Sequence, residues 1–150
     1  MKKCIILTLF ICILWSNAPA WCSEKGFVGI VKNVRSEAFI IRNDISENAI
    51  IGKKIEMGDV LKTGSNGSMG VIFMDDTVIA MGPKTEIFIH TFLFEPVKGN
   101  LSFIAKMVKG TVNFISGQIS KLAPGSVDFQ TPYFTIGDRG THFLVKVEEE

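Results

Sequence analysis

The sequence predicts an all-β protein, a single domain of many short strands arranged as a sandwich or as a β-roll or solenoid-like structure. Apolar residues recur at every second position in several short runs, which is the periodicity of a half-buried strand. Glycines interrupt these runs so often after residue 50 that a helix of ordinary length has little room. The run at 86–94 carries apolar residues on both faces, which indicates a strand covered on each side and disfavours a flat open sheet.

Four runs show the alternation most clearly. Three of them place their apolar residues on one face, and the sets are Met69, Val71 and Phe73, then Val112 and Phe114, then Phe143, Val145 and Val147. In the run at 86–94 the same rule places Ile87, Ile89 and Leu93 on one face and Phe88, His90, Phe92 and Phe94 on the other. The aromatic residues are twelve Phe against two Trp and one Tyr, so we expect most of them to lie in the core rather than on a sugar-binding surface.

Two segments fit more than one structure. Residues 101–108 have helical as well as strand spacing, and Asn100 before them is a good helix cap. Because Gly110 ends this stretch after barely two turns, we expect a strand there. The glycine-rich residues 64–70 are similar to a phosphate-binding loop, but they contain no lysine and open a strand rather than a helix. We expect them to form a β-hairpin.

The first twenty residues have the features of a secretory signal peptide. Lys2 and Lys3 precede an uncharged, mostly apolar run at 4–15, and the small residues Ala18 and Ala20 stand at positions −3 and −1 of a cut after Ala20. The alternative is a retained membrane anchor, but the run is shorter than the ~20 apolar residues of a spanning helix. We therefore expect a periplasmic or secreted protein with no membrane span after cleavage.

Cleavage after Ala20 defines the rest of the chain as one domain at 21–147 followed by an acidic tail at 148–150. A lipoprotein cut before Cys22 would need a small residue where Trp21 stands, so we expect no lipidation. The mature chain keeps fourteen basic and fifteen acidic residues, a net charge of −1, which gives no electrostatic reason to bind nucleic acid. Cys22 is its only cysteine, so no internal disulfide forms.

A set of short motifs follows in a fixed order along the mature chain. In order they are Gly29-Ile30-Val31, Gly58-Asp59, Leu61-Lys62-Thr63-Gly64, Val71-Ile72-Phe73-Met74-Asp75-Asp76-Thr77, Gly82-Pro83-Lys84-Thr85, Val108-Lys109-Gly110-Thr111, Thr131-Pro132 and Ile136-Gly137-Asp138-Arg139-Gly140-Thr141-His142-Phe143. This order resembles the FecR family of bacterial cell-envelope domains over about residues 26–147. The most specific part is Arg139-Gly140-Thr141-x-Phe143, shortly after Thr131-Pro132.

The resemblance implies an extracytoplasmic domain. The best-known members of the family span the membrane, receive a signal from an outer-membrane iron-siderophore transporter and control a sigma factor inside the cell. This sequence contains no sigma-binding segment and no second apolar span, so it is more similar to stand-alone exported members, and the iron-signalling activity is not carried over. Family members usually continue past the strand at Phe143 into another hairpin, so either the domain closes early or the sequence is a truncated product.

The motif residues have structural roles in this interpretation. These residues are Asp75, Asp76, Thr77, Gly137, Gly140, Thr141 and Phe143. The family usually has glycine at the position of Asp76, so we expect a turn with a positive φ there, which Asp tolerates better than most residues. We expect Gly140 to allow a kink or bulge as the last strand begins, and Arg139 to bond to carbonyls or to a carboxylate such as Asp59 or Asp75.

No residue pattern points to catalysis, a metal or a cofactor. The two histidines, His90 and His142, lack metal-ligand spacing, and we expect both on the outward side of strands. The adjacent carboxylates of Asp75 and Asp76 are explained by turn chemistry. Cys22 has no histidine nearby in the sequence, and no nucleophile elbow occurs. We therefore expect no enzyme.

The remaining interpretation is a cell-envelope module for protein interaction or signalling, whose partner is a protein of the cell envelope. Strand addition is the natural mode of binding, because an unpaired last strand at 141–147 would offer free backbone donors and acceptors. The candidate binding residues are Arg139, Tyr133 and Asp138. The alternative is a module that binds envelope glycan or a small ligand, for which Tyr133 is the candidate contact. The sequence leaves the oligomeric state open.

Overall fold

The protein is an all-β sandwich of twelve strands, seen in a computed structural model that describes residues 26–138 and 142–148. The fold class predicted from the sequence is confirmed. The strands are β1 (Gly29–Arg35), β2 (Ala38–Arg42), β3 (Ile45–Asn48), β4 (Lys54–Ile55), β5 (Val60–Thr63), β6 (Ser68–Phe73), β7 (Val78–Met81), β8 (Glu86–Glu95), β9 (Asn100–Ile115), β10 (Val127–Gln130), β11 (Thr135–Asp138) and β12 (His142–Val147). Two short helical segments, η1 (Pro96–Lys98) and α2 (Gln118–Leu122), join them.

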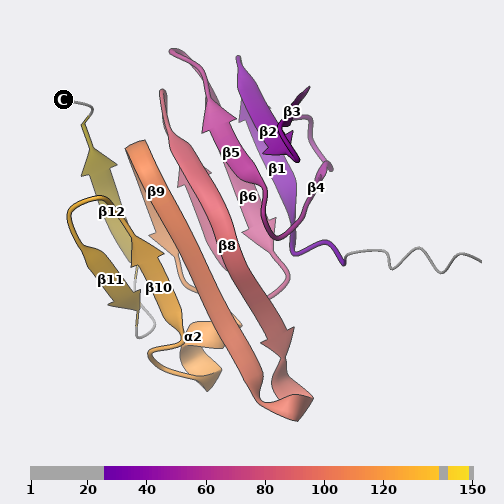
Figure 1. Ribbon diagram of the computed structural model, residues 1–150, viewed down its shortest axis with the longest axis vertical. Coiled ribbons are helices and arrows are strands. Elements are labelled where there is room, and N and C mark those ends of the chain that lie inside the picture. Colours follow the sequence, from indigo (N-terminus) through magenta and orange to yellow (C-terminus); the bar gives the residue numbers. More distant parts are fainter. Residues whose placement is uncertain (1–25, 139–141, 149–150) are drawn as a thin grey trace, which may run out of the picture.

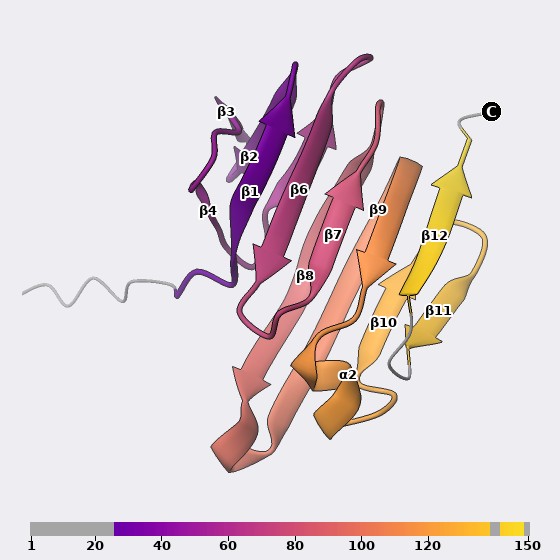
Figure 2. The same ribbon diagram turned by 180° about the vertical axis from the view of Figure 1, so that it is seen from behind.

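The strands form one sheet that folds back on itself into two layers. One layer contains β3, β2, β5, β8, β10 and β11, and the other contains β4, β1, β6, β7 and β12 (Figures 1 and 2). The strand β9 belongs to both layers, because its first part pairs with β8 and β10 and its last part pairs with β7 and β12. All these pairings are antiparallel except that of β9 with β10. The long strand β9 therefore connects the two halves of the core.

The passage of β9 from one layer to the other occurs at Gly110. This residue has a φ of 104°, and a Cβ atom built on it would lie 2.3 Å from the Cα atom of Thr85. The next residue of β9, Thr111, is bound through both of its backbone groups by the Thr85 hydroxyl. This hydroxyl accepts a hydrogen bond from the Thr111 N–H at 2.9 Å and donates one to the Thr111 carbonyl at 3.1 Å. A side chain at position 110 has no space in this arrangement.

The core between the layers contains a continuous series of phenylalanine rings. The ring centroids of Phe73 and Phe103 lie 4.7 Å apart, those of Phe103 and Phe114 lie 6.0 Å apart, and Phe114 stacks on Phe143 at 4.8 Å. The rings thus join β6, β9 and β12, which are distant in the sequence. The prediction that phenylalanine forms the core is confirmed for these rings and for the buried Phe92 and Phe129.

Three expectations about local structure are wrong. One is that β8 is covered on both faces, since its buried residues, Ile87, Ile89 and Phe92, all face the core. The turn at 64–67 does not close a hairpin, because β5 pairs with β2 and β8 whereas β6 pairs with β1 and β7 in the other layer. In β8, the register against β9 shifts between Ile89 and Thr91. After this bulge Phe92 lies in the core and Leu93 is 45% exposed, so the predicted faces of these two residues are exchanged.

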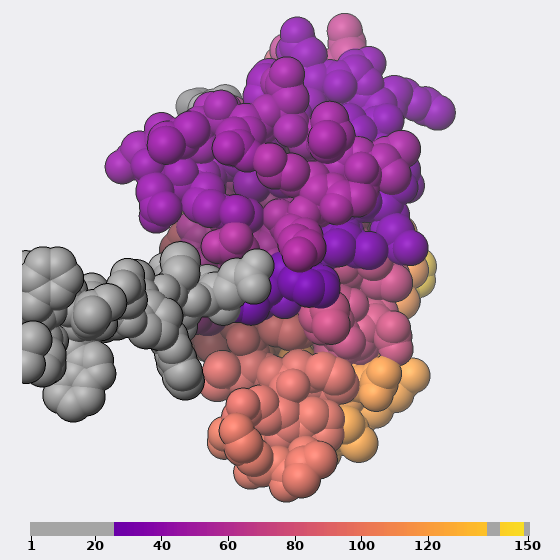
Figure 3. All heavy atoms as spheres, turned by 90° about the vertical axis from the view of Figure 1, so that its right-hand side faces the viewer, coloured from indigo at the N-terminus to yellow at the C-terminus, as the bar shows by residue number. Residues whose placement is uncertain are grey.

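The residues before β5 close one side of the sandwich. Figure 3 shows residues of this N-terminal part, in indigo and purple, covering that side above the turn between β8 and β9. In the described ranges, 26–138 and 142–148, no helix has both the length and the apolar character needed to cross a bilayer.

Candidate functional site

The opposite side of the sandwich ends at β12, which is bonded to the rest of the described chain along one edge only. Each of its residues from His142 to Val147 is paired with β9, and no other described strand pairs with it. The prediction of an unpaired last strand therefore holds for one of its two edges. Phe143, Val145 and Val147 face inward, while His142, Leu144 and Lys146 are exposed on the outer face. Leu144 is 71% exposed, next to Asn113 of β9.

The edge of the other layer lies at β11, and the turn that precedes it exposes two aromatic side chains. The Thr131 hydroxyl accepts hydrogen bonds from the N–H groups of Tyr133 and Phe134, at 3.3 and 3.0 Å, and donates one to the Phe134 carbonyl at 2.8 Å. This turn leaves Tyr133 65% exposed and Phe134 49% exposed. Threonine in the Thr131-Pro132 motif thus fixes the turn, and the aromatic residues after it are presented to solvent.

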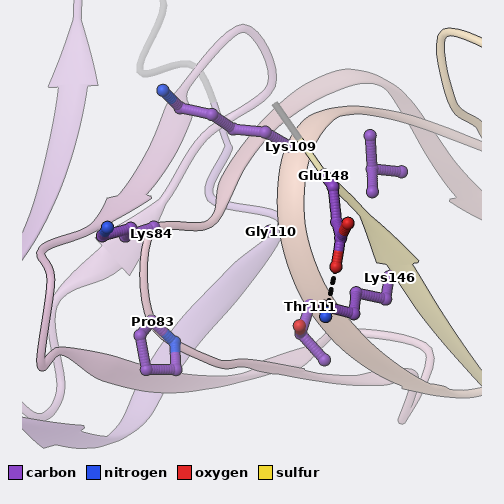
Figure 4. A pocket seen from close by; sticks show the side chains of 8 residues that line it. Pro83, Lys84, Lys109, Gly110, Thr111, Lys146 and Glu148 are labelled. Carbon is purple, nitrogen blue, oxygen red and sulfur yellow. Dashed lines mark hydrogen bonds and ion pairs between the residues drawn. The ribbon is translucent and has the colours of Figure 1, made fainter. Parts of the chain in front are cut away.

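Lysines gather at the end of the sandwich where β12 finishes. A cavity of about 360 Å³ there is lined by Lys84, Lys109, Lys146 and Glu148, among others. A neighbouring cavity of about 330 Å³ shares Lys84 and Lys109 and adds Lys62. Figure 4 shows the side chains of Lys84 and Lys109 extending to the same side, away from the paired Lys146 and Glu148. Tyr133 lines neither cavity.

Among the described residues, the carboxylates of Glu148 and Glu86 pair with lysines at this end. Lys146 Nζ lies 2.5 Å from Glu148 Oε1, and Lys62 Nζ lies 3.3 Å from Glu86 Oε2. The hydrogen bond from Lys146, together with its charge, lowers the pKa of Glu148 below its ordinary value. Lys62 and Lys146 therefore each bind a carboxylate of the chain itself.

The Asp75-Asp76-Thr77 motif anchors the turn between β6 and β7 to α2. The buried Asp75 carboxylate accepts hydrogen bonds from the Thr77 hydroxyl at 2.7 Å and from the Thr77 N–H at 3.1 Å. The Thr77 hydroxyl in turn accepts a hydrogen bond from the Gly117 N–H at 3.0 Å. Asp76 has a φ of 66°, which confirms the expected positive value. The motif is a structural turn, since the carboxylate of Asp75 is engaged by its own neighbours.

A second buried carboxylate, Asp59, is bound by Arg42 at the end of β2. The guanidinium donates to both Asp59 oxygens, from Nε at 2.8 Å and from Nη2 at 2.7 Å, and to Glu56 Oε1 from Nη1 at 2.6 Å. The hydrogen bond to Asp59 and the charges of Asp59 and Glu56 raise the pKa of Arg42 above its ordinary value. Asp59, which we considered as a partner of Arg139, is therefore bound to Arg42.

The structure places the predicted motif residues as follows. Gly137 and Asp138 lie in β11, and Phe143 lies in β12 with its ring stacked on Phe114. Arg139, Gly140 and Thr141 lie outside the described residues, so their expected roles stay predictions. Both histidines are exposed, as expected. Within residues 26–138 and 142–148, no group of three or more His, Cys, Asp or Glu side chains forms a candidate metal site.

Sequence reasoning missed three features of this site. Leu144 and Lys146 were not singled out, although the alternation that buries Val145 places both of them outward. The signal was present in the sequence, because inward positions of a strand define its outward positions. The approach of Lys84, in the turn between β7 and β8, to Lys109 of β9 carried no comparable signal, since it depends on the pairing of β8 with β9.

The comparisons with known proteins agree with the order of motifs. The family model described as FecR protein matches residues 59–150, which is more than half of the chain. The match begins just before β5, so β1 to β4 precede it. No curated protein and no solved structure matches the chain. Membership of this family supports a signalling or regulatory module. The chain belongs to the FecR protein family.

Proposed function

We propose that the chain is an exported, non-enzymatic member of the FecR family that acts in the cell envelope as a protein-interaction module of a signalling system. The observation that carries this proposal is the open edge of β12, with Leu144 exposed beside it. An open edge presents unpaired backbone N–H and C=O groups, and a partner can satisfy them by adding a strand.

The apolar surface near this edge supports a protein as the partner. Leu144 and Ile115 are 71% and 42% exposed, and they lie on adjacent strands of the same layer. Backbone hydrogen bonds provide affinity in strand addition, whereas contacts of alternate side chains provide specificity. The open edge of β12 offers the backbone groups, and its outward face offers the side chains.

The buried carboxylates support a non-enzymatic role. Asp59 is engaged by Arg42 and Asp75 by Thr77, and each pair fixes a turn of the sandwich. A catalytic acid or base must reach a substrate, and a carboxylate whose oxygens are occupied by structural partners in the core does not.

The first expected outcome concerns contact at position 144. A photoreactive amino acid replacing Leu144 in intact cells is expected to yield a covalent adduct with an envelope protein, identified by mass spectrometry. Binding of that purified protein is then measured with Leu144→Asn. We expect about tenfold weaker binding, because burying a leucine side chain is worth about 1.5–3 kcal/mol and each 1.4 kcal/mol is tenfold.

The matched control is Val97 on η1, which is fully exposed at the far end of the β8–β9 turn. A photoreactive amino acid at position 97 is expected to give no adduct with the same protein, and Val97→Asn is expected to bind like the unchanged chain. Equal capture from both positions, or full affinity of Leu144→Asn, would contradict the proposal.

The second expected outcome concerns export. The leader is expected to be removed after Ala20, so the N-terminal sequence of the protein recovered from the envelope or the medium should begin at Trp21-Cys22. Replacing Ala18 with a bulky residue such as Phe should block the cut, because the peptidase admits only small side chains at this position. Recovery of the unprocessed chain from the cytoplasm as the main product would show that it is not exported.

A further inference from the structure

A cavity of about 500 Å³ lies on the side of the sandwich that the residues before β5 close. Its lining includes Ile50 and Ile51 together with Arg42, Lys53, Lys54 and Glu56. Ile50 is 62% exposed and Ile51 is 69% exposed, although both are large apolar side chains. The volume is in the range of cavities that hold a small organic group, and an exposed apolar lining favours an apolar occupant.

The turn that carries these isoleucines is held by hydrogen bonds and an ion pair. The Gly52 N–H donates to the Val31 carbonyl of β1 at 2.8 Å, and the Lys53 N–H donates to the Ile50 carbonyl at 3.0 Å. The Lys53 side chain pairs with Glu47 of β3. The cavity is therefore formed before anything binds to it, and binding there does not require the turn to be ordered first.

The charged groups around the cavity favour an aromatic occupant over a charged one. Arg42 and Lys53 are each paired with a carboxylate of the chain itself. Lys54 Nζ lies 4.9 Å from the centroid of the Phe27 ring, so a cation of the lining already contacts the face of an aromatic ring. Tryptophan is the ring that binds cations best, and it also has a large apolar area to bury.

A tryptophan lies within reach, five residues before Gly26, where the described chain begins. This residue, Trp21, is the only tryptophan after the predicted signal peptide. The segment 21–25 spans at most about 16–18 Å when it is fully extended. Phe27 places the start of this span beside the cavity, because its ring contacts Lys54 of the lining. The segment is therefore long enough to bring the indole to the cavity.

We propose that the segment 21–25 folds back onto this cavity, with the indole of Trp21 packed against Ile50 and Ile51. The segment covers the apolar lining and withdraws it from contact with other molecules. The inference concerns the side of the sandwich opposite β12, so it does not depend on what binds at that edge.

The experiment measures the fluorescence of Trp21 in the exported protein, in which it is the single tryptophan. The full chain with Trp15→Phe also has Trp21 as its single tryptophan, so the measurement does not depend on the cut. We expect emission at a shorter wavelength than that of N-acetyltryptophanamide in the same buffer, and weaker quenching by acrylamide, because the ring is removed from water. Trp21→Ala should shift the methyl NMR signals of Ile50 and Ile51, because the ring current is lost, and leave those of Val97 unchanged.

A substitution in the cavity should release the indole. Ile51→Asn is expected to lower the ratio of bound to free segment about tenfold, as expected for the loss of one buried isoleucine side chain. The emission of Trp21 then moves to a longer wavelength, and quenching by acrylamide increases. The matched control is Val97→Asn, which also replaces an exposed apolar residue but lies on η1, and it should leave the emission unchanged. Neither side chain belongs to the core, so both variants should keep the circular-dichroism spectrum of the unchanged protein.

Emission and quenching equal to those of N-acetyltryptophanamide would overturn the proposal, and so would a short-wavelength emission that Ile51→Asn leaves unchanged. A dimer that sedimentation detects and Ile51→Asn dissociates would assign the cavity to a second copy instead. Binding to phosphatidylglycerol vesicles that Ile51→Asn abolishes would assign it to a lipid surface. Failure of the proposed function differs from all of these, since the absence of an adduct at position 144 leaves the emission of Trp21 unchanged.

Discussion

Replacing Gly110 with alanine is expected to lower the free energy of unfolding by more than about 3 kcal/mol, which is a large part of the stability of a domain of this size. The new Cβ atom would lie 2.3 Å from the Thr85 Cα atom, and the φ of 104° would be strained for any residue with a side chain. Backbone atoms cannot move aside as the end of a flexible side chain can. Strand β9 would have to shift at the point where it joins the two layers.

The control for this prediction is Gly99→Ala. Gly99 also has a positive φ, 72°, but no atom lies within 4 Å of a Cβ built on it. This variant therefore reports the backbone strain alone, which is about 1–2 kcal/mol for a residue in the left-handed region. Urea unfolding followed by circular dichroism compares the two variants. Equal destabilisation by both would show that the contact between β9 and Thr85 has no steric role.

A side chain at position 110 would also affect the end of the molecule where the lysines lie. Gly110 separates Lys109 from Thr111, and the Thr85 hydroxyl holds both backbone groups of Thr111. A shift of β9 at this point would move Lys109 relative to Lys146 on β12, since β12 pairs with β9 up to Gly110. The fold and the proposed binding edge therefore depend on the same glycine.

Much of the core could be predicted from the sequence, because period-two alternation is a local property. The face formed by Met69, Val71 and Phe73 is buried as predicted, and so is the face formed by Val112 and Phe114. The choice of a strand at 101–108 is confirmed by β9. In the first two sets the inward positions repeat without interruption, so the alternation alone determines the buried face. The strand at 101–108 was expected for another reason, because Gly110 ends that stretch.

Alternation fails where a bulge interrupts it. In β8 the inward residues are Ile87 and Ile89 and then Phe92, and the expected Leu93 is turned outward. The extra residue belongs to the pairing of β8 with β9, so it is invisible in either strand alone. The same bulge leaves His90 exposed, and β8 packs on the core with one face rather than the predicted two.

Contacts between segments distant in the sequence are the other feature that local patterns did not predict. The glycine-rich turn at 64–67 has the residues of a hairpin, but it carries the chain between layers, and turn chemistry is the same in both cases. The helix α2 was not predicted, because its five residues are too few to show a period. Its start is fixed instead by the distant Asp75, whose backbone carbonyl accepts a hydrogen bond from the Gln118 N–H at 2.6 Å.

Arg42 is the clearest residue that local reasoning missed, and its contacts lead to the second large prediction. Its guanidinium fork binds both oxygens of Asp59, whose side chain is 1% exposed. Asp59 also accepts a hydrogen bond from the Glu56 N–H at 2.8 Å, so it closes the turn before β5. Removing the guanidinium would leave a buried carboxylate without its cation, which costs much more than the loss of an exposed pair.

Arg42→Ala is therefore expected to lower the free energy of unfolding by about 3 kcal/mol. The double variant Arg42→Ala with Asp59→Asn should be more stable than Arg42→Ala alone, because the uncharged amide needs no cation and its oxygen still accepts from Glu56 N–H. Lys98→Ala, which removes the cation of an exposed pair, should change stability by less than about 0.5 kcal/mol. If Arg42→Ala and Lys98→Ala destabilise the protein equally in urea unfolding, the Arg42 contact is an ordinary surface pair, and the turn before β5 is held by its backbone hydrogen bonds alone.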